Sequence, residues 1–346
     1  MRMTPNPSVL AIAVLLGSTV LATAGSHSAG ELNLYSSRHY DTDERLYSDF
    51  EEMTGITINR IEGKADELIA RMEAEGANSP ADILLTVDTS RIERAKNAGV
   101  LAAVESPVLE ARIPSYLQDA ENEWFGFSQR ARILFYDKDI VTDPPATYAA
   151  LADPKYAGQI CVRSSSNVYM QTILAAIIEH EGEAAAKAWA EGVKNNFARD
   201  PQGGDTDQLR GIASGECAIA MSNTYYFARA VRKDVKGLPE DVRAKIGWVF
   251  PDQGDGNGAH INLSAGAVAK HAPNRDNAVR FLEYLASDQA QQYFSAGNDE
   301  YPAVPGVAVS PAVASLGFFK PDDVSLSAVA KNVPTAQMIY NEVGWE

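Results

Sequence analysis

Short apolar runs alternate with amphipathic segments over residues 32 to 98, and this alternation constrains the fold more than any other feature of the chain. Runs typical of strands are separated by patterns with apolar residues on one helical face, in the order 32–35, 42–54, 56–59, 65–76, 83–85 and 90–98. Strands that alternate with helices in this way form a parallel sheet covered by helices on both faces. The sequence therefore predicts an α/β fold.

The pattern changes near Phe125 and indicates a second α/β unit. Residues 131–136 are typical of a long strand, and three helical patterns follow at 169–180, 183–195 and 205–213. A second crossing is predicted at 246–250, before a glycine-rich loop, a strand at 261–264, two more helices and a proline-rich tail with short helices. Two α/β lobes joined by two crossing segments form a hinged cleft that closes on a ligand.

The lobes predicted in this way are discontinuous in sequence. Lobe 1 comprises 31–128 and 259–300, and lobe 2 comprises 129–258 and 301–346. One larger α/β domain is the alternative.

The first residues of the chain differ in composition from the rest. Arg2 is their only charged residue, 9–20 is nearly all apolar, and Ala22-Thr23-Ala24 has the small-x-small form of a signal-peptidase site. The apolar run is too short for a stable transmembrane helix. We therefore predict a cleavable signal peptide at 1–24 and export to the periplasm.

Charge and cysteine content narrow the function further. The chain has 46 acidic and 30 basic residues, a balance that argues against nucleic acid and anionic membranes as partners, because both need clustered Lys and Arg.

Cys161 and Cys217 are the only cysteines of the chain. An even pair in an exported protein predicts a disulfide. The alternative, a metal site, has too few ligands with two thiolates.

Three stretches place tyrosine after a predicted strand: His39-Tyr40, Tyr169, and Tyr225-Tyr226. Loops that follow strands face the ligand cleft in α/β proteins. A phenol, with a pKa of about 10, becomes a strong and hard oxygen donor only when a highly charged cation displaces its proton. Calcium and magnesium prefer carboxylates and carbonyls, and zinc prefers His or Cys. This set therefore predicts Fe(III), whereas packing as ordinary aromatic surface or core is the alternative.

Arginines accompany these stretches and the proposed crossings, namely Arg38, Arg130, Arg132, Arg163 and Arg229. Guanidinium groups offset the surplus charge of several phenolates and order their oxygens by hydrogen bonds. Ordinary surface ion pairs are the alternative for each arginine. Of the other histidines, His180 is expected to be satisfied or solvated, and His260 to lie near the cleft after the glycine-rich loop.

Five stretches together resemble the ferric-iron-binding proteins of bacterial ABC importers, transferrin-like members of the periplasmic-binding-protein superfamily. They are Ser36-Ser37-Arg38-His39-Tyr40, Asn78-Ser79-Pro80-Ala81-Asp82, Arg163-Ser164-Ser165-Ser166-Asn167, Pro201-Gln202-Gly203-Gly204-Asp205-Thr206-Asp207 and Asn223-Thr224-Tyr225-Tyr226. The resemblance covers nearly all of the mature chain. It implies a two-lobed (type II) Venus-flytrap fold and one Fe(III) between the lobes, with the ligands His39, Tyr40, Tyr169, Tyr225 and Tyr226. Members of the family differ in whether the histidine engages and whether a synergistic anion completes the coordination.

The resulting hypothesis is a monomeric periplasmic protein that captures Fe(III), closes, and delivers the ion as cargo to the membrane permease of an ABC importer, without enzymatic turnover. Two alternatives remain. One is a protein of the same fold that binds a small organic cation or anion and uses the tyrosines as stacking walls. The other is an exported α/β enzyme that uses cleft tyrosines as acid or base.

Overall fold

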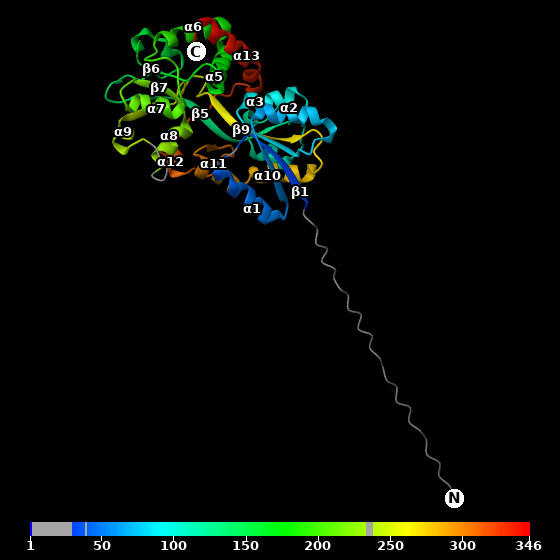
Figure 1. The fold of residues 1–346 in the computed structure, drawn as a ribbon. Helices are drawn as coiled ribbons and strands as arrows, with labels where there is room; N and C mark the ends of the chain where they lie inside the picture. Colours follow the sequence, from blue (N-terminus) through cyan, green and yellow to red (C-terminus); the bar gives the residue numbers. More distant parts are fainter. Residues whose placement is uncertain (2–29, 39, 233–237) are drawn as a thin grey trace.

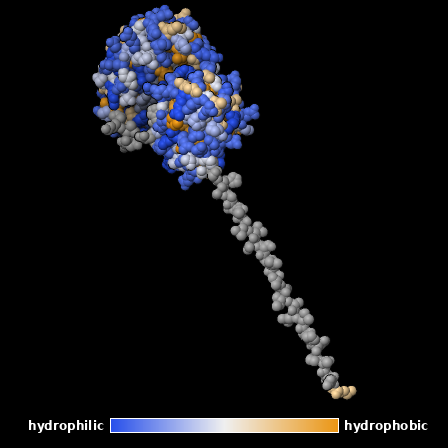
Figure 2. Space-filling model, turned by 45° about the vertical axis from the view of Figure 1, so that its right-hand side comes forward, coloured by the Kyte–Doolittle hydropathy of each residue, from blue (hydrophilic) through white to orange (hydrophobic). Residues whose placement is uncertain are grey.

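The computed structural model describes residues 1, 30–38, 40–232 and 238–346. The predicted signal peptide (1–24), apart from Met1, and His39 lie outside the described residues. Within the described ranges, no helix combines the length and the apolar character needed to cross a bilayer. The face shown in Figure 2 is mostly hydrophilic, and its apolar side chains form small scattered groups.

The first body of the structure is the predicted α/β unit. Parallel strands alternate with helices in the order β1 (Glu31–Ser36), α1 (Glu44–Thr54), β2 (Thr57–Glu62), α2 (Ala65–Glu75), β3 (Ile83–Val87) and α3 (Thr89–Asn97). Gly55 ends α1 with a φ of 71°, the left-handed conformation that helix C-caps favour. Figure 1 shows α2 and α3 on one side of this sheet and α1 and α10 (Arg275–Leu285) on the other.

The predicted parallel pairing of the strands within 32–98 is confirmed, whereas the complete sheet is mixed. β9 (Ile261–Ala269) runs antiparallel to β3, and the short β4 (Leu101–Ala102) pairs with the end of β9. The chain reaches β9 from the second body and not through a crossover helix on the same sheet. Antiparallel pairing needs no such crossover.

One long strand, β5 (Phe125–Asp137), belongs to both bodies. Its first half pairs with β9, and its second half pairs with β7 (Ile219–Asn223) and β8 (Ile246–Val249). The strand order is β2-β1-β3-β9-β5-β7-β6, where β6 is Ile160–Cys161. The return crossing is not at 246–250, where the sequence predicts it, because β8 lies beside only the second half of β5. The chain returns to the first body through β9.

The three helices predicted for the second part of the sheet are present as α5 (Val168–Glu181), α6 (Glu183–Asn195) and α7 (Asp205–Ala213). Two further helices were not predicted, α8 (Thr224–Val231) and α9 (Glu240–Lys245). Short helices α4 (Pro107–Arg112) and α12 (Pro311–Ala314), helix α11 (Asp288–Asn298) and strand β10 (Tyr301–Pro302) complete the connections.

Buried apolar side chains form separate clusters in the two bodies. One cluster comes mainly from 32–127 and 261–304, and two others come from 131–259 and 301–345. We propose that these clusters are the cores of the two predicted lobes.

The C-terminal tail differs from the prediction of short helices. α13 (Leu326–Val343) is a single helix of 18 residues that contains Pro334. An interior proline costs a helix about 3 kcal/mol. Packing offsets this cost, because Ala336, Ile339 and Tyr340 are buried against the second body, and the Tyr340 hydroxyl donates to the carbonyl of Met170 in α5 at 2.9 Å.

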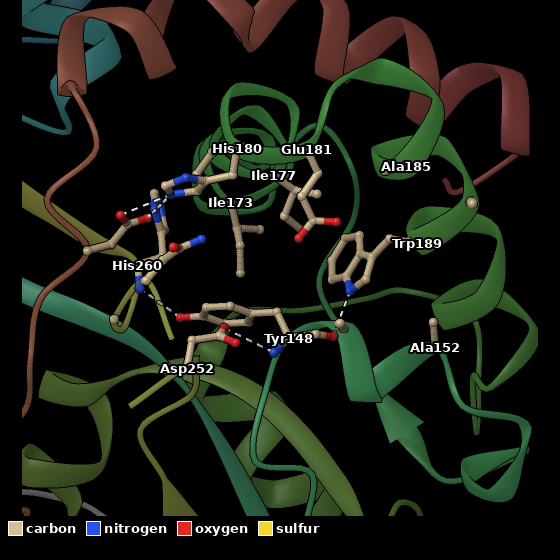
Figure 3. A pocket seen from close by; sticks show the side chains of 16 residues that line it. Tyr148, Ala152, Ile173, Ile177, His180, Glu181, Ala185, Trp189, Asp252 and His260 are labelled. Atoms are coloured by element: carbon tan, nitrogen blue, oxygen red, sulfur yellow. Dashed lines mark hydrogen bonds and ion pairs between the residues drawn. The ribbon is translucent and has the colours of Figure 1, made fainter. Parts of the chain in front are cut away.

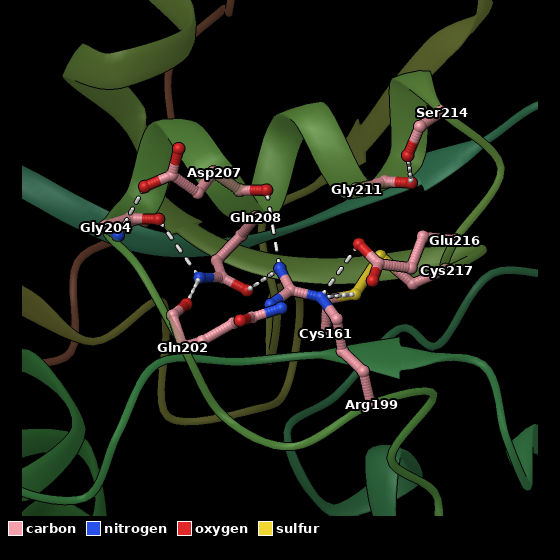
Figure 4. Close-up of a disulfide and its surroundings, with 10 residues drawn as sticks. All are labelled: Cys161, Arg199, Gln202, Gly204, Asp207, Gln208, Gly211, Ser214, Glu216 and Cys217. Atoms are coloured by element: carbon pink, nitrogen blue, oxygen red, sulfur yellow. Dashed lines mark hydrogen bonds and ion pairs between the residues drawn. A yellow bond between two sulfur atoms is a disulfide. The ribbon is translucent and has the colours of Figure 1, made fainter.

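The predicted disulfide is confirmed. Cys161 of β6 and Cys217, just before β7, are bonded across a Cα–Cα distance of 5.8 Å. Figure 4 shows Gly211 of α7 against the bond, where a Cβ would approach the sulfur of Cys217 to 2.8 Å. Arg199 lies on the other side, and its Nε donates to the sulfur of Cys161 at 3.3 Å. The disulfide therefore ties β6 to the entry of β7.

Removing the disulfide with Cys161→Ala and Cys217→Ala together should lower the free energy of unfolding by about 4 kcal/mol, since the bond closes a loop over a sequence separation of 56. Urea unfolding followed by circular dichroism measures the change. Reductant should lower the wild-type midpoint and leave that of the double variant unchanged. Equal midpoints for both proteins without reductant would contradict this role.

A buried ionic network joins the two bodies at the start of β10. Glu300 accepts hydrogen bonds from Arg38 at 3.0 Å, from Arg130 at 3.3 Å and from the hydroxyl of Ser128 at 2.8 Å. Arg38 also donates to Asp43 at 2.7 Å. Burial by itself would raise the pKa of Glu300, but the two arginines outweigh burial and lower that pKa below its ordinary value. Glu300 is therefore a buried carboxylate whose charge stabilises the fold.

Glu300→Gln should lower the free energy of unfolding at neutral pH by about 3 kcal/mol, because it leaves buried arginine charge uncompensated. A carboxylate whose folded pKa is lowered stabilises the protein above its unfolded pKa, and this stability is lost as the pH falls through the folded pKa. The difference between wild type and variant should therefore shrink below about pH 4. Denaturant titrations at several pH values test this, with the exposed Glu105→Gln as control.

Candidate metal centre

Four of the five predicted ligands lie together in the structure. The hydroxyl oxygens of Tyr169 and Tyr225 are 3.3 Å apart, and the ring centroids of Tyr225 and Tyr226 are 4.1 Å apart. Tyr40, which follows β1 in the first body, is near enough for its charge to raise the pKa values of Tyr225 and Tyr226. Phenol groups from both bodies therefore converge on one place. The fifth predicted ligand, His39, lies outside the described residues.

Three of these tyrosines occupy the first turns of helices, where the sequence predicts loops. Asn167 caps α5 by accepting a hydrogen bond from the amide of Tyr169 at 3.1 Å. β7 leads directly into α8, so Tyr225 and Tyr226 lie in the first turn of that helix. The positive end of a helix dipole favours negative charge at this position. Ionised phenols are therefore better stabilised there than in an unstructured loop.

Burial raises the pKa of all four phenols above the ordinary value for tyrosine. Mutual repulsion among the ionised rings raises the pKa of Tyr225 further. Without a bound cation, the four hydroxyl groups are therefore protonated at neutral pH. A strongly charged ion that displaces these protons obtains a set of hard, anionic oxygen donors.

All five arginines singled out in the sequence lie over rings of this cluster. The guanidinium carbon of Arg38 is 4.8 Å from the ring centroid of Tyr40, and that of Arg229 is 5.4 Å from Tyr225. The other three surround Tyr169 at 5.7 to 5.9 Å, namely Arg130, Arg132 and Arg163. Their positive charge opposes the effect of burial and favours ionised phenols.

Arg130 has two buried nitrogens without a hydrogen-bond partner, more than any other of these five arginines among the described residues. Its side chain is 1% exposed, and one terminal nitrogen donates to Ser264 and Glu300. Its Nε and other terminal nitrogen have no hydrogen-bond partner among the described residues. Buried guanidinium donors without a partner are costly. An anion beside the guanidinium group would satisfy these donors.

The carboxylates that form ion pairs with these arginines were not predicted from the sequence. Asp205, at the start of α7, accepts hydrogen bonds from Arg132 at 2.7 and 2.8 Å and from the amide of Asn223 at 3.1 Å. It thereby fixes the residue just before the turn that carries Tyr225 and Tyr226. Asp205 lies within one of the five stretches of the resemblance, whereas nothing local in the sequence marks Glu300.

Other histidines do not join the cluster. His180 pairs with Asp322 at 3.0 Å, as expected of a satisfied side chain, and the Nε2 of buried His260 lies 3.3 Å from the hydroxyl of Thr172. Across the described part of the chain, no group of three His, Cys, Asp or Glu side chains is arranged to hold a metal ion. The tyrosines are therefore the candidate ligands.

The chain is similar to known iron uptake and ferric-binding proteins. The chain is 44% identical to iron uptake protein A1 of Synechocystis sp., over 97% of this chain and 96% of that protein. Trichodesmium IdiA (FutA), solved in complex with iron and citrate, is 47% identical with a TM-score of 0.86, over 92% of this chain and 100% of that one. The ferric binding protein of Campylobacter jejuni is 42% identical with a TM-score of 0.82, over 91% and 100%.

These similarities confirm the predicted two-lobed periplasmic-binding-protein (type II) fold. The relatives are uptake and binding proteins, in agreement with the expectation of a binding protein and not an enzyme. The family model described as bacterial extracellular solute-binding protein matches residues 45–320. The chain therefore belongs to the family of bacterial extracellular solute-binding proteins.

Proposed function

We propose that this protein binds one Fe(III) ion between its two lobes, through the phenolates of Tyr40, Tyr169, Tyr225 and Tyr226 with His39 as a further ligand. The observation that carries the proposal is the convergence of four phenol groups, drawn from both bodies, among five arginines. Phenolate oxygens are hard donors, and three of them neutralise a trivalent ion. The arginines offset the charge of the fourth.

The unpartnered donors of Arg130 supply a place for a synergistic anion beside the ion. A carboxylate or carbonate oxygen would accept from its free N–H groups, as anions do from arginine forks. The similarity to the Trichodesmium protein, whose structure holds iron and citrate, supports an anion in this role.

Capture and release follow from the two-body architecture. Tyr40 belongs to the first body and the other three tyrosines to the second, so binding the ion through both sets favours the closed state. The closed protein then presents the ion to the permease of an ABC importer, after export to the periplasm by the signal peptide at 1–24. Protonation of a phenolate, or reduction to the less charged Fe(II), weakens the site and releases the ion.

Purified protein mixed with ferric citrate should become reddish, because phenolate-to-Fe(III) charge transfer absorbs visible light. Tyr225→Phe with Tyr226→Phe should abolish the band and weaken Fe(III) binding by about 100-fold or more, since two ligands are lost. Tyr116→Phe, outside the cluster, is the matched control, and circular dichroism checks the fold. A colourless wild-type protein would contradict the proposal and favour the alternative of a small organic ion as ligand.

Iron binding should release about one proton for each phenol that coordinates, because the raised pKa values keep these phenols protonated in the iron-free protein. The affinity should therefore fall as the pH falls, by about tenfold per pH unit for each phenol. Proton release is measured with an indicator dye in weak buffer, against a blank of the same ferric chelate. Tyr40→Phe should release one proton fewer, and unchanged release would exclude Tyr40 as a ligand.

A further inference from the structure

A second cavity lies in the second body, apart from the tyrosine cluster. It has a volume of about 340 Å³ and is bounded by α5, α6, Tyr148 and the segments around Asp252 and Asp322. Its apolar wall comes from Ile173 and Ile177 of α5 and Trp189 of α6, as Figure 3 shows. A cavity of this size, mostly apolar with a few polar groups, is typical of a small-molecule site.

The polar groups of this cavity are predominantly anionic. Glu181, Asp252 and Asp322 line it, and no Lys or Arg is among its lining residues. Burial raises the pKa of Asp252, and the charges of Asp322 and Glu181 raise it further, although the amide of Tyr148 and His180 oppose them. Asp252 is therefore repelled by the neighbouring charges of Asp322 and Glu181. A cation in the cavity would relieve this repulsion.

His260 supplies an independent sign of a missing ligand. This side chain is 3% exposed, and its Nδ1 is buried without a hydrogen-bond partner in the described part of the chain. Burial and Arg132 lower its pKa to about 3, so the ring is neutral. The Thr172 hydroxyl donates to the carbonyl of Tyr169 and therefore accepts from Nε2–H of His260. Nδ1 is then a free acceptor at the cavity wall.

We infer that this cavity binds a small organic ammonium ion. The ammonium group would donate to Nδ1 of His260 and to the carboxylates of Asp252 and Glu181, while its apolar body would pack against Ile173, Ile177 and Trp189. A bare metal ion is disfavoured, because the described residues contain no group of His, Cys, Asp or Glu arranged to hold one. The inference is independent of the iron proposal.

The probes are isobutylammonium, cyclohexylammonium and 2-phenylethylammonium, added to the purified iron-free protein and followed by calorimetry and protein NMR. At least one should bind saturably with one site per chain. Cyclohexanol, which keeps the body and loses the charge, should bind about tenfold more weakly than cyclohexylammonium. Cyclohexanecarboxylate should not bind. Absence of saturable binding by all three amines, or equal binding of alcohol and amine, would overturn the inference and leave a solvent-filled cavity.

Variants locate the site. Asp252→Asn should weaken amine binding about tenfold. The substitution should not strain the backbone, because the φ of 55° at Asp252 is a conformation that asparagine tolerates. Ala185→Leu, at the half-buried wall of the cavity, should abolish binding by filling the space, whereas Ala184→Leu on the exposed neighbouring position should not. Retention of the circular dichroism spectrum and of the urea unfolding midpoint shows that the variants fold. Unchanged amine affinity in both Asp252→Asn and Ala185→Leu would exclude this cavity.

Discussion

Two buried arginines on β5 impose the constraint on which the rest of the structure depends. Arg130 and Arg132 are two residues apart, so both project from one face of the strand shared by the two bodies. Each is nearly inaccessible to water, and a buried guanidinium needs a carboxylate partner. Glu300 meets Arg130 from the start of β10, and Asp205 meets Arg132 from the start of α7. Distant segments are therefore fastened to the strand where the bodies meet.

The same two arginines set the chemistry beside them. Both lie over the ring of Tyr169, and burial alone would keep that phenol protonated. Positive charge held against a buried phenol lowers the free energy of its ionised form without supplying a competing ligand. Burial keeps the phenol protonated when no cation is bound, and the guanidinium charge reduces the cost of ionising it when a cation displaces the proton.

Support for the cluster comes from elements that themselves carry no ligand. The disulfide ties β6 to the entry of β7, and Asp205 holds Asn223 at the exit of β7, two residues before Tyr225. α5 bears Tyr169 in its first turn and is held along its length by α13, through Tyr340 and neighbouring apolar residues. Tyr169, Tyr225 and Tyr226 are thus presented by helix starts and not by loops. Such placement would limit the reorganisation needed for an ion to bind.

The sequence by itself determined the α/β alternation and the bounds of α6 and α7, because these follow from local periodicity. It also determined the pairing of Cys161 with Cys217 and the tyrosines and arginines of the candidate site. These follow from residue chemistry and from a resemblance carried by contiguous motifs. Only the tertiary structure decided the antiparallel entry of β9, the single helix α13, and the partners Glu300 and Asp205 of the buried arginines. Those features depend on contacts between distant segments, such as Arg38 with Glu300 across 262 positions, for which no neighbouring residue carries a signal.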